Sequence, residues 1–121
     1  MAVIPDLLFH VVSKRKWQSL VKNGLYRPDT FDEHQGVDCV SGSDLNQYLN
    51  ERYHGRKNLL LIVIEVSRLQ KKSEIKVIEK QETNRINIYR IPEAIHKLAI
   101  LDKIRIDCNE DKMFDVQLYQ E

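Results

Sequence analysis

The chain has few of the residues that specialise a sequence for one task. Its 121 residues include two cysteines, three prolines and four glycines, and no linker, internal repeat or low-complexity tract. Cys39 and Cys108 lack zinc-ligand spacing, and two thiols are too few for a disulfide scaffold. The sequence contains no glycine-rich phosphate loop, no Gly-x-Ser-x-Gly elbow and no helix-turn-helix. We therefore expect one domain over residues 1–121, in a reducing compartment.

Charge of one sign and long apolar runs are also missing. The formal net charge is +1, although 31% of the residues are charged. No global field attracts the chain to nucleic acid or to a membrane surface, so we expect no strong nucleic-acid binding. The longest apolar run, Leu59 to Ile64, is far shorter than the roughly 20 residues of a membrane helix. Residues 1–6 do not resemble a signal peptide. We expect a cytoplasmic protein with no membrane partner.

The hydrophobic pattern predicts several strands. They are expected at residues 7–12, 37–40, 59–66, 75–79, 86–89 and 98–106. The run at 59–66 hardly alternates, which is typical of a central strand covered on both faces. Residues 113–119 are expected to form an edge strand or a short tail.

Two helices are predicted among the first 55 residues. The first begins after Ser13 and stops at Gly24, and the second begins at Ser43–Asp44 and stops at Gly55. The second has an apolar stripe, formed by Leu45, Tyr48, Leu49 and Tyr53. Residues 25–36 are predicted to be an irregular loop, and residues 92–95 a single helical turn. Two early helices followed by a run of strands indicate an α+β fold.

A series of spaced motifs resembles one known family. The motifs are Phe9-His10, Trp17, Gly24-x-Tyr26-x-Pro28, Gly36-x-x-x-x-Ser41, the strand 59–66 followed by Leu69, Glu79, and Ile88-Tyr89 before Pro92-Glu93-Ala94-Ile95. In order and spacing they resemble domain of unknown function family 952, over nearly the whole chain. The resemblance implies a small ADP-ribosyltransferase-like fold, with a split or curved, mostly antiparallel β-sheet and two helices.

Two positions depart from that family. Cys39 stands where the family has a histidine in its second strand, and Asn87 stands at another histidine position. His10, Ser41, Glu79 and Tyr89 match the family. If the missing histidines do chemistry in other members, the resemblance implies weak or absent catalysis in this chain.

His10 and Glu79 are the candidate catalytic residues. Imidazole donates and accepts hydrogen bonds, so His10 suits a ribose or phosphate contact. The alternative is a histidine bonded to backbone at the end of a strand. The resemblance implies that Glu79 holds the nicotinamide-ribose hydroxyl of NAD and stabilises a cationic transition state. The alternative is a solvent-facing charge on an edge strand.

Ser41, Tyr89, Asn87 and Cys39 are the candidate ligand-binding residues. Tyr89 offers a ring face and a hydroxyl, or is a core tyrosine with a wet tip. Ser41 contacts a ligand or caps the helix that follows. Asn87 can keep a hydrogen bond but cannot transfer a proton. Cys39 is a nucleophile or a small buried thiol, and the thiol is the simpler interpretation. Tyr26 is a packing residue or part of a cleft wall.

Two groups of cations have a plain structural explanation. Lys14, Arg15 and Lys16 open the first helix, where we expect a solvated face. Arg52 and Arg56 flank the end of the second helix, where they bind an anion or complement the negative helix terminus.

Three functions are compatible with these features. The first is a nucleotide- or NAD-binding enzyme, or enzyme relic, of the ADP-ribosyltransferase type. The second is a non-catalytic module that binds a protein or a metabolite. The third is RNA-end chemistry, because 2′-phosphotransferases share this general fold, but the near-neutral charge gives it little support.

Overall fold

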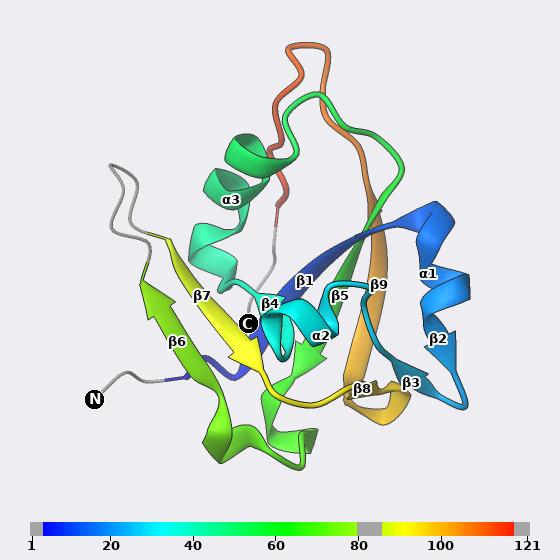
Figure 1. The fold of residues 1–121 in the computed structure, drawn as a ribbon. Coiled ribbons are helices and arrows are strands. Elements are labelled where there is room, and N and C mark those ends of the chain that lie inside the picture. Colours follow the sequence, from blue (N-terminus) through cyan, green and yellow to red (C-terminus); the bar gives the residue numbers. More distant parts are fainter. Residues whose placement is uncertain (1–3, 80–85, 118–121) are drawn as a thin grey trace.

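The computed structural model describes residues 4–79 and 86–117 as an α+β fold with three antiparallel sheets (Figure 1). The helices are α1 (Lys14–Leu20), α2 (Phe31–His34) and α3 (Leu45–Arg52). The strands are β1 (Leu7–Ser13), β2 (Val21–Lys22), β3 (Leu25–Tyr26), β4 (Val37–Cys39), β5 (Leu59–Glu65), β6 (Lys76–Glu79), β7 (Asn87–Ile91), β8 (Ile95–His96) and β9 (Ile100–Ile106). Their orders in the sheets are β1-β5-β9, β2-β3-β8 and β4-β7-β6. None of the helices in these residues is long and apolar enough to cross a bilayer.

The apolar run at 59–66 forms the central strand β5, as predicted. β5 pairs with β1 on one side and with β9 on the other, both antiparallel. Its first six residues are all buried. A strand with neighbours on both edges and side chains packed on both faces needs apolar residues at every position, which explains the absence of alternation.

The two faces of the β1–β5 pair belong to different cores. Leu60, Ile62 and Ile64 pack on the side of α1, whose Trp17 and Leu20 join them. On the other face, the intervening β5 side chains pack against α3 and residue 114. Figure 1 shows α1 and α3 on opposite sides of these strands. The predicted stripe of the second helix is confirmed in this second core by the buried side chains of Leu45, Tyr48 and Leu49.

A single bridge joins the sheet that contains β1 to the sheet that contains β4. Phe9 and Val40 exchange two backbone hydrogen bonds of 2.9 Å. β4 then continues with β7 as its partner and β1 with β5, so the two strands separate beside this bridge. The outcome is a split sheet with a fork between β1 and β4.

The first predicted helix is shorter than expected. α1 ends at Leu20, and residues 21–36, which include the predicted loop, contain β2, β3 and α2. Asn23 and Gly24 both have positive φ angles and form the turn between β2 and β3. An Asn-Gly pair favours this tight hairpin turn, so Gly24 turns a hairpin and does not end a helix.

One prediction for the later part of the chain is also wrong. Residues 92–95 do not form a helical turn, because Ile95 begins β8 and pairs with Tyr26 of β3. Residues 113–117 form no strand, in agreement with the alternative of a short tail, and residues 118 and 119 of that prediction lie outside the described residues. The pairing of β8 with the distant strand β3 thus outweighs the local preference for a helical turn at Ile95.

Two asparagines of α3 hold the segment around Phe114 and Val116. The Asn50 side chain donates to the Phe114 carbonyl at 3.1 Å and accepts from the Phe114 N–H. Asn46 makes the same pair of bonds with Val116, at 3.0 and 2.7 Å. The two side-chain amides lie four residues apart on one helix face. Each bonds to both the N–H and the carbonyl of one residue, as a neighbouring strand would. This contact fixes α3, which also carries Tyr48 and Arg52.

The Asn50→Ala variant should lose about 1–2 kcal/mol of unfolding free energy, because two hydrogen bonds to a half-buried backbone disappear. Urea unfolding followed by circular dichroism measures this loss. Gln47→Ala is the matched control, because Gln47 lies on the same helix and makes none of these bonds. Equal losses in the two variants would contradict the role given to Asn50.

Candidate functional site

A cleft of about 450 Å³ opens along the second half of β1. Residues 10–13 of β1 form its base, and residues 28–34 with α2 form one wall. Side chains of two helices complete the cleft: Arg15 and Lys16 from α1, and Tyr48 and Arg52 from α3. Among the described residues, no group of three or more histidine, cysteine or acidic side chains is arranged to hold a metal ion.

His10 bridges the fork between β1 and β4. Its Nδ1 lies 2.8 Å from the Asp38 backbone oxygen, and its Nε2 lies 2.6 Å from the Tyr26 hydroxyl. A carbonyl oxygen can only accept a hydrogen bond, so Nδ1 carries the proton. Nε2 therefore accepts from the Tyr26 hydroxyl. The bond to backbone that was one interpretation of His10 is present. His10 also lines the cleft, and its contact with a ligand stays a prediction.

Burial keeps both members of this pair uncharged. Desolvation lowers the pKa of His10 below its ordinary value of 6.5, although the bond to the Asp38 carbonyl and the nearby Asp38 charge partly oppose this. Desolvation likewise raises the pKa of the Tyr26 hydroxyl well above its usual range. The pair is a neutral imidazole hydrogen-bonded to a protonated phenol at the base of the cleft.

Aromatic stacking fixes the position of Tyr26. The Trp17 and Tyr26 rings stack with centroids 4.7 Å apart and planes 28° apart. The Lys103 ammonium lies 5.5 Å from the centroid of the Trp17 ring. Tyr26 is only 1% exposed. Its ring is held by this packing, and its hydroxyl bonds to His10. Offset stacking of this kind contributes about 0.5–1.5 kcal/mol beyond simple burial.

Asp38 connects the elements around the cleft. Its carboxylate accepts from Arg90 of β7, at 2.7 Å from Nε and 3.2 Å from the second guanidinium nitrogen. The His34 imidazole of α2 lies 3.0 Å from the same carboxylate. Together with its carbonyl bond to His10, Asp38 links β4 to β1, β7 and α2. The side-chain hydrogen bond to Asp38 raises the pKa of Arg90, and the Asp38 charge acts in the same direction.

Exposed arginines line the mouth of the cleft. The Arg52 guanidinium lies 5.6 Å from the Tyr48 ring centroid, and that of Arg56 lies 5.8 Å from the Tyr53 ring. Arg15 joins them from α1. None of these three arginines takes part in the ion pairs found among the described residues, whereas Lys16 pairs with Asp29 at 3.3 Å. The cleft is therefore lined by three guanidinium groups that lie outside the ion pairs found among residues 4–79 and 86–117.

The predicted site residues are distributed over more than this cleft. Among those whose side chains the structure describes, only His10 lines it. Cys39 and Tyr89 face each other across β4 and β7 in the core, with 1% and 7% exposure. Asn87 pairs with Glu79 across β7 and β6, and the Glu79 side chain lies outside the described part. The roles given to these four residues stay predictions.

Ser41 and Cys39 have local partners instead of a visible ligand contact. The Ser41 hydroxyl lies 3.1 Å from the Ser43 hydroxyl, and Ser41 stands at the start of the 3-10 turn Gly42–Asp44 without a side-chain cap. The Cys39 thiol points at the Val37 carbonyl, 3.7 Å away. Desolvation raises the pKa of Cys39 well above its ordinary value, so it remains a thiol. This supports the buried-thiol interpretation.

Sequence reasoning did not identify the cationic mouth as one feature. Arg15 is exposed, as the prediction of a solvated face requires, but it also lines the cleft. Arg52 is the last residue of α3 and Arg56 lies four residues further on, and both proposed roles remain compatible with their positions. The available sequence signal was that Arg52 follows Tyr48 by four residues and Arg56 follows Tyr53 by three. Asp38 and His34 gave no sequence signal.

Lowering the pH should destabilise the protein through His10. Above its unfolded pKa near 6.5, His10 is neutral in both states. Below that value the unfolded state binds a proton that the folded state does not, so stability falls by up to about 1.4 kcal/mol per pH unit. Urea unfolding between about pH 7.5 and 5 should show a shallower loss in His10→Gln. The other three histidines are present in both proteins, so equal slopes would contradict this assignment.

Both thiols should be unreactive in the folded protein. Cys39 and Cys108 are buried and unpaired by any disulfide, so a reagent cannot reach either sulfur in the folded protein. The raised pKa of Cys39 also leaves that residue little thiolate to react. A chromogenic disulfide reagent should label neither cysteine in native buffer and both in concentrated guanidinium chloride. Rapid labelling of Cys39 in the native protein, tested with Cys108→Ala, would contradict its burial.

Comparisons with known proteins identify the fold and leave the family open. No family model matches the chain, and no curated protein matches it. The crystal structure of protein CC0527 from Caulobacter crescentus matches with a TM-score of 0.72 and 14% identity, over 88% of this chain and 91% of that one. A double mutant of CC0527 gives 0.72 at 13% identity. Its solution structure gives 0.70 at 14%, over 90% and 91% of the two chains. The chain therefore shares the α+β fold of CC0527.

Proposed function

We propose that this chain is a nucleotide-binding domain of the ADP-ribosyltransferase type, belonging to the family 952 pattern, and that its ligand occupies the cleft along β1. One observation carries the proposal: Arg15, Arg52 and Arg56 line a cleft whose base contains the neutral His10. Guanidinium groups match phosphate oxygens in charge and in hydrogen-bond geometry. A phosphate ester is therefore the ligand best suited to this mouth.

The base of the cleft suits the hydroxyls of a ribose. Tyr26 keeps its proton, and its oxygen retains acceptor capacity beyond the bond to His10. Residues of α1, α3 and segment 28–34 surround this point, so a bound sugar would be shielded from water on several sides. The fork between β1 and β4 supplies the opening that a split sheet needs for such a ligand.

Catalysis would depend on a carboxylate that reaches the ligand. The resemblance gives that role to Glu79, at the end of β6. The two carboxylates that line the cleft, Asp29 and Asp38, are engaged with Lys16 and with Arg90. Binding is thus the part of the activity that the described side chains support, and a relic that binds NAD or another nucleotide without turnover is included in the proposal.

A non-catalytic module is the second candidate. The observation that favours it is Cys39, which replaces a family histidine and is buried as a neutral thiol in the core. A protein or a metabolite would be the ligand of such a module. Both candidates are proposed for the cytoplasm, without a membrane partner and without strong nucleic-acid binding.

Isothermal titration with NAD, ADP-ribose and adenosine monophosphate tests nucleotide binding. We expect at least one of these ligands to bind the wild-type protein, and Arg56→Ala to weaken that binding about 10-fold, the effect of one lost charge-assisted bond. Arg68→Ala is the matched control, because Arg68 is exposed, pairs with Glu65 and does not line this cleft.

Two outcomes would overturn the proposal. One is no binding of any of the three ligands at millimolar concentration. The other is an equal loss of affinity in Arg68→Ala and Arg56→Ala, which would place the ligand outside the cleft. Nicotinamide release from NAD, measured in wild type and Glu79→Gln, separates an enzyme from a relic.

A further inference from the structure

The positive charge of the cleft is gathered at one end. The cleft follows β1 from His10 to Ser13, a run of roughly 10 Å at the ordinary rise of a strand, and reaches Arg15 at the start of α1. His10 therefore marks one end of this path and Arg15 marks the other.

Arg56, in the segment that follows α3, belongs to the same end of the cleft as Arg15. The Lys14 N–H donates to the Asn58 carbonyl at 2.9 Å, which joins the start of α1 to the chain just after Arg56. Arg52 is the last residue of α3, four positions before Arg56, and both line the cleft. Three guanidinium groups, from α1, α3 and the segment after α3, thus line one small cleft, with Arg15 and Arg56 at the end away from His10.

The end near His10 is close to neutral. His10 and Tyr26 are uncharged, for the reason of burial given above. The Asp38 carboxylate beside them is held by the Arg90 guanidinium, which compensates its charge. This end offers hydrogen bonds without a net charge, whereas the opposite end offers charge.

A cleft with arginines at one end and neutral hydrogen-bonding groups at the other matches a nucleotide bound in one orientation. We propose that the arginine end holds a terminal phosphate monoester while the nucleoside lies toward His10, so that the ligand class is nucleoside monophosphates. The inference rests on the proposed nucleotide-binding function and narrows it. NAD and ADP-ribose carry their charge between two sugars, which would call for cations in the middle of the cleft. A terminal phosphate instead offers three free oxygens and up to two charges at its end.

A free nucleotide fits the cleft better than a nucleic-acid strand. The net charge of +1 provides no extended basic surface along which a phosphate backbone could run. The uncompensated arginines are confined to a cleft of about 450 Å³, a volume within the range of small-molecule sites.

Titration calorimetry with matched ligands tests this ligand class. At about pH 7.5 we expect adenosine monophosphate to bind about 10-fold or more tightly than NAD, ADP-ribose, adenosine or inorganic phosphate. Between about pH 7.5 and 5 the affinity for the monophosphate should fall several-fold, because its second phosphate pKa is near 6. The internal diphosphate of ADP-ribose does not titrate in this range. Comparing the two ligands on one protein cancels the titration of the protein itself.

Variants locate the phosphate. Arg15→Gln should weaken monophosphate binding about 10-fold and leave adenosine binding unchanged, since only the phosphate contacts this end. Arg68→Gln, on another surface, should change neither affinity. Thermal melting of each variant checks that it is folded, and the exposure of both arginines makes folded variants the expected result.

Three results would overturn the ligand class. NAD or ADP-ribose binding as tightly as the monophosphate would leave nucleotide binding standing and remove the preference for a terminal phosphate. A 5′-phosphorylated RNA oligomer binding about 10-fold more tightly than the monophosphate would assign the site to nucleic-acid ends. Absence of binding by every nucleotide would remove the proposed function together with this inference.

Discussion

The hydrogen bond from His10 to the Asp38 carbonyl allows β1 and β4 to separate without leaving that carbonyl unsatisfied. β1 and β4 share one bridge and then part, so backbone groups beside the fork lose their strand partner. Buried carbonyl groups need a hydrogen bond, and the 2.8 Å bond from His10 supplies it at Asp38. The same bond fixes the tautomer of the imidazole and aims Nε2 at Tyr26. One side chain thus satisfies the backbone at the fork, and the space between the separated strands remains part of the cleft.

The electrostatics of the cleft follow from which charges the scaffold already uses. Asp38 holds Arg90 and His34 in the wall, and Asp29 holds Lys16. These pairs serve the framework, so the carboxylates that line the cleft do not neutralise the arginines at its mouth. Cation–π contacts with Tyr48 and Tyr53 keep Arg52 and Arg56 near these rings without cancelling their charge. The charges paired within the framework and the arginine charges that line the cleft are therefore separate sets.

Sequence patterns predicted the elements that burial controls. The run at 59–66 and the stripe around Leu49 were predicted correctly, because their period follows directly from the faces they bury. Gly24 and residues 92–95 were mispredicted, because the two-residue strands β3 and β8 exist only through their mutual pairing. His10 was predicted as a site residue. Its place in one cleft with Arg15 and Arg56 was not predicted, since a backbone bond between Lys14 and Asn58 joins segments that are distant in the sequence.

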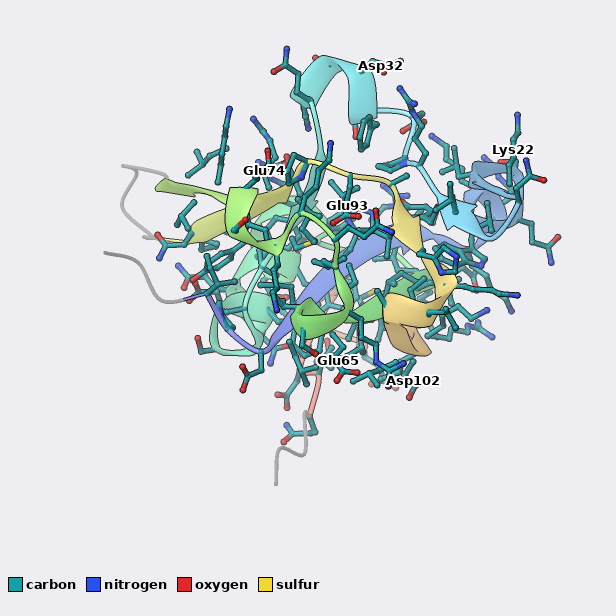
Figure 2. The ribbon with its side chains drawn as sticks, turned by 90° about the horizontal axis from the view of Figure 1, so that it is seen from below. Lys22, Asp32, Glu65, Glu74, Glu93 and Asp102 are labelled. Carbon is teal, nitrogen blue, oxygen red and sulfur yellow. The ribbon has the colours of Figure 1, made fainter. Side chains whose placement is uncertain are left out.

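The stacking of Trp17 on Tyr26 has an optical consequence. Trp17 is the single tryptophan of the chain, its ring lies 4.7 Å from that of Tyr26, and Tyr26 bonds directly to the histidine in the cleft. Lys22 and Asp32 project from β2 and α2 at the periphery (Figure 2), whereas this aromatic pair lies half-buried or buried inside. Any shift of the Tyr26 hydroxyl alters the surroundings of the indole. The molecule thus contains an intrinsic fluorophore that reports on its own cleft without a label.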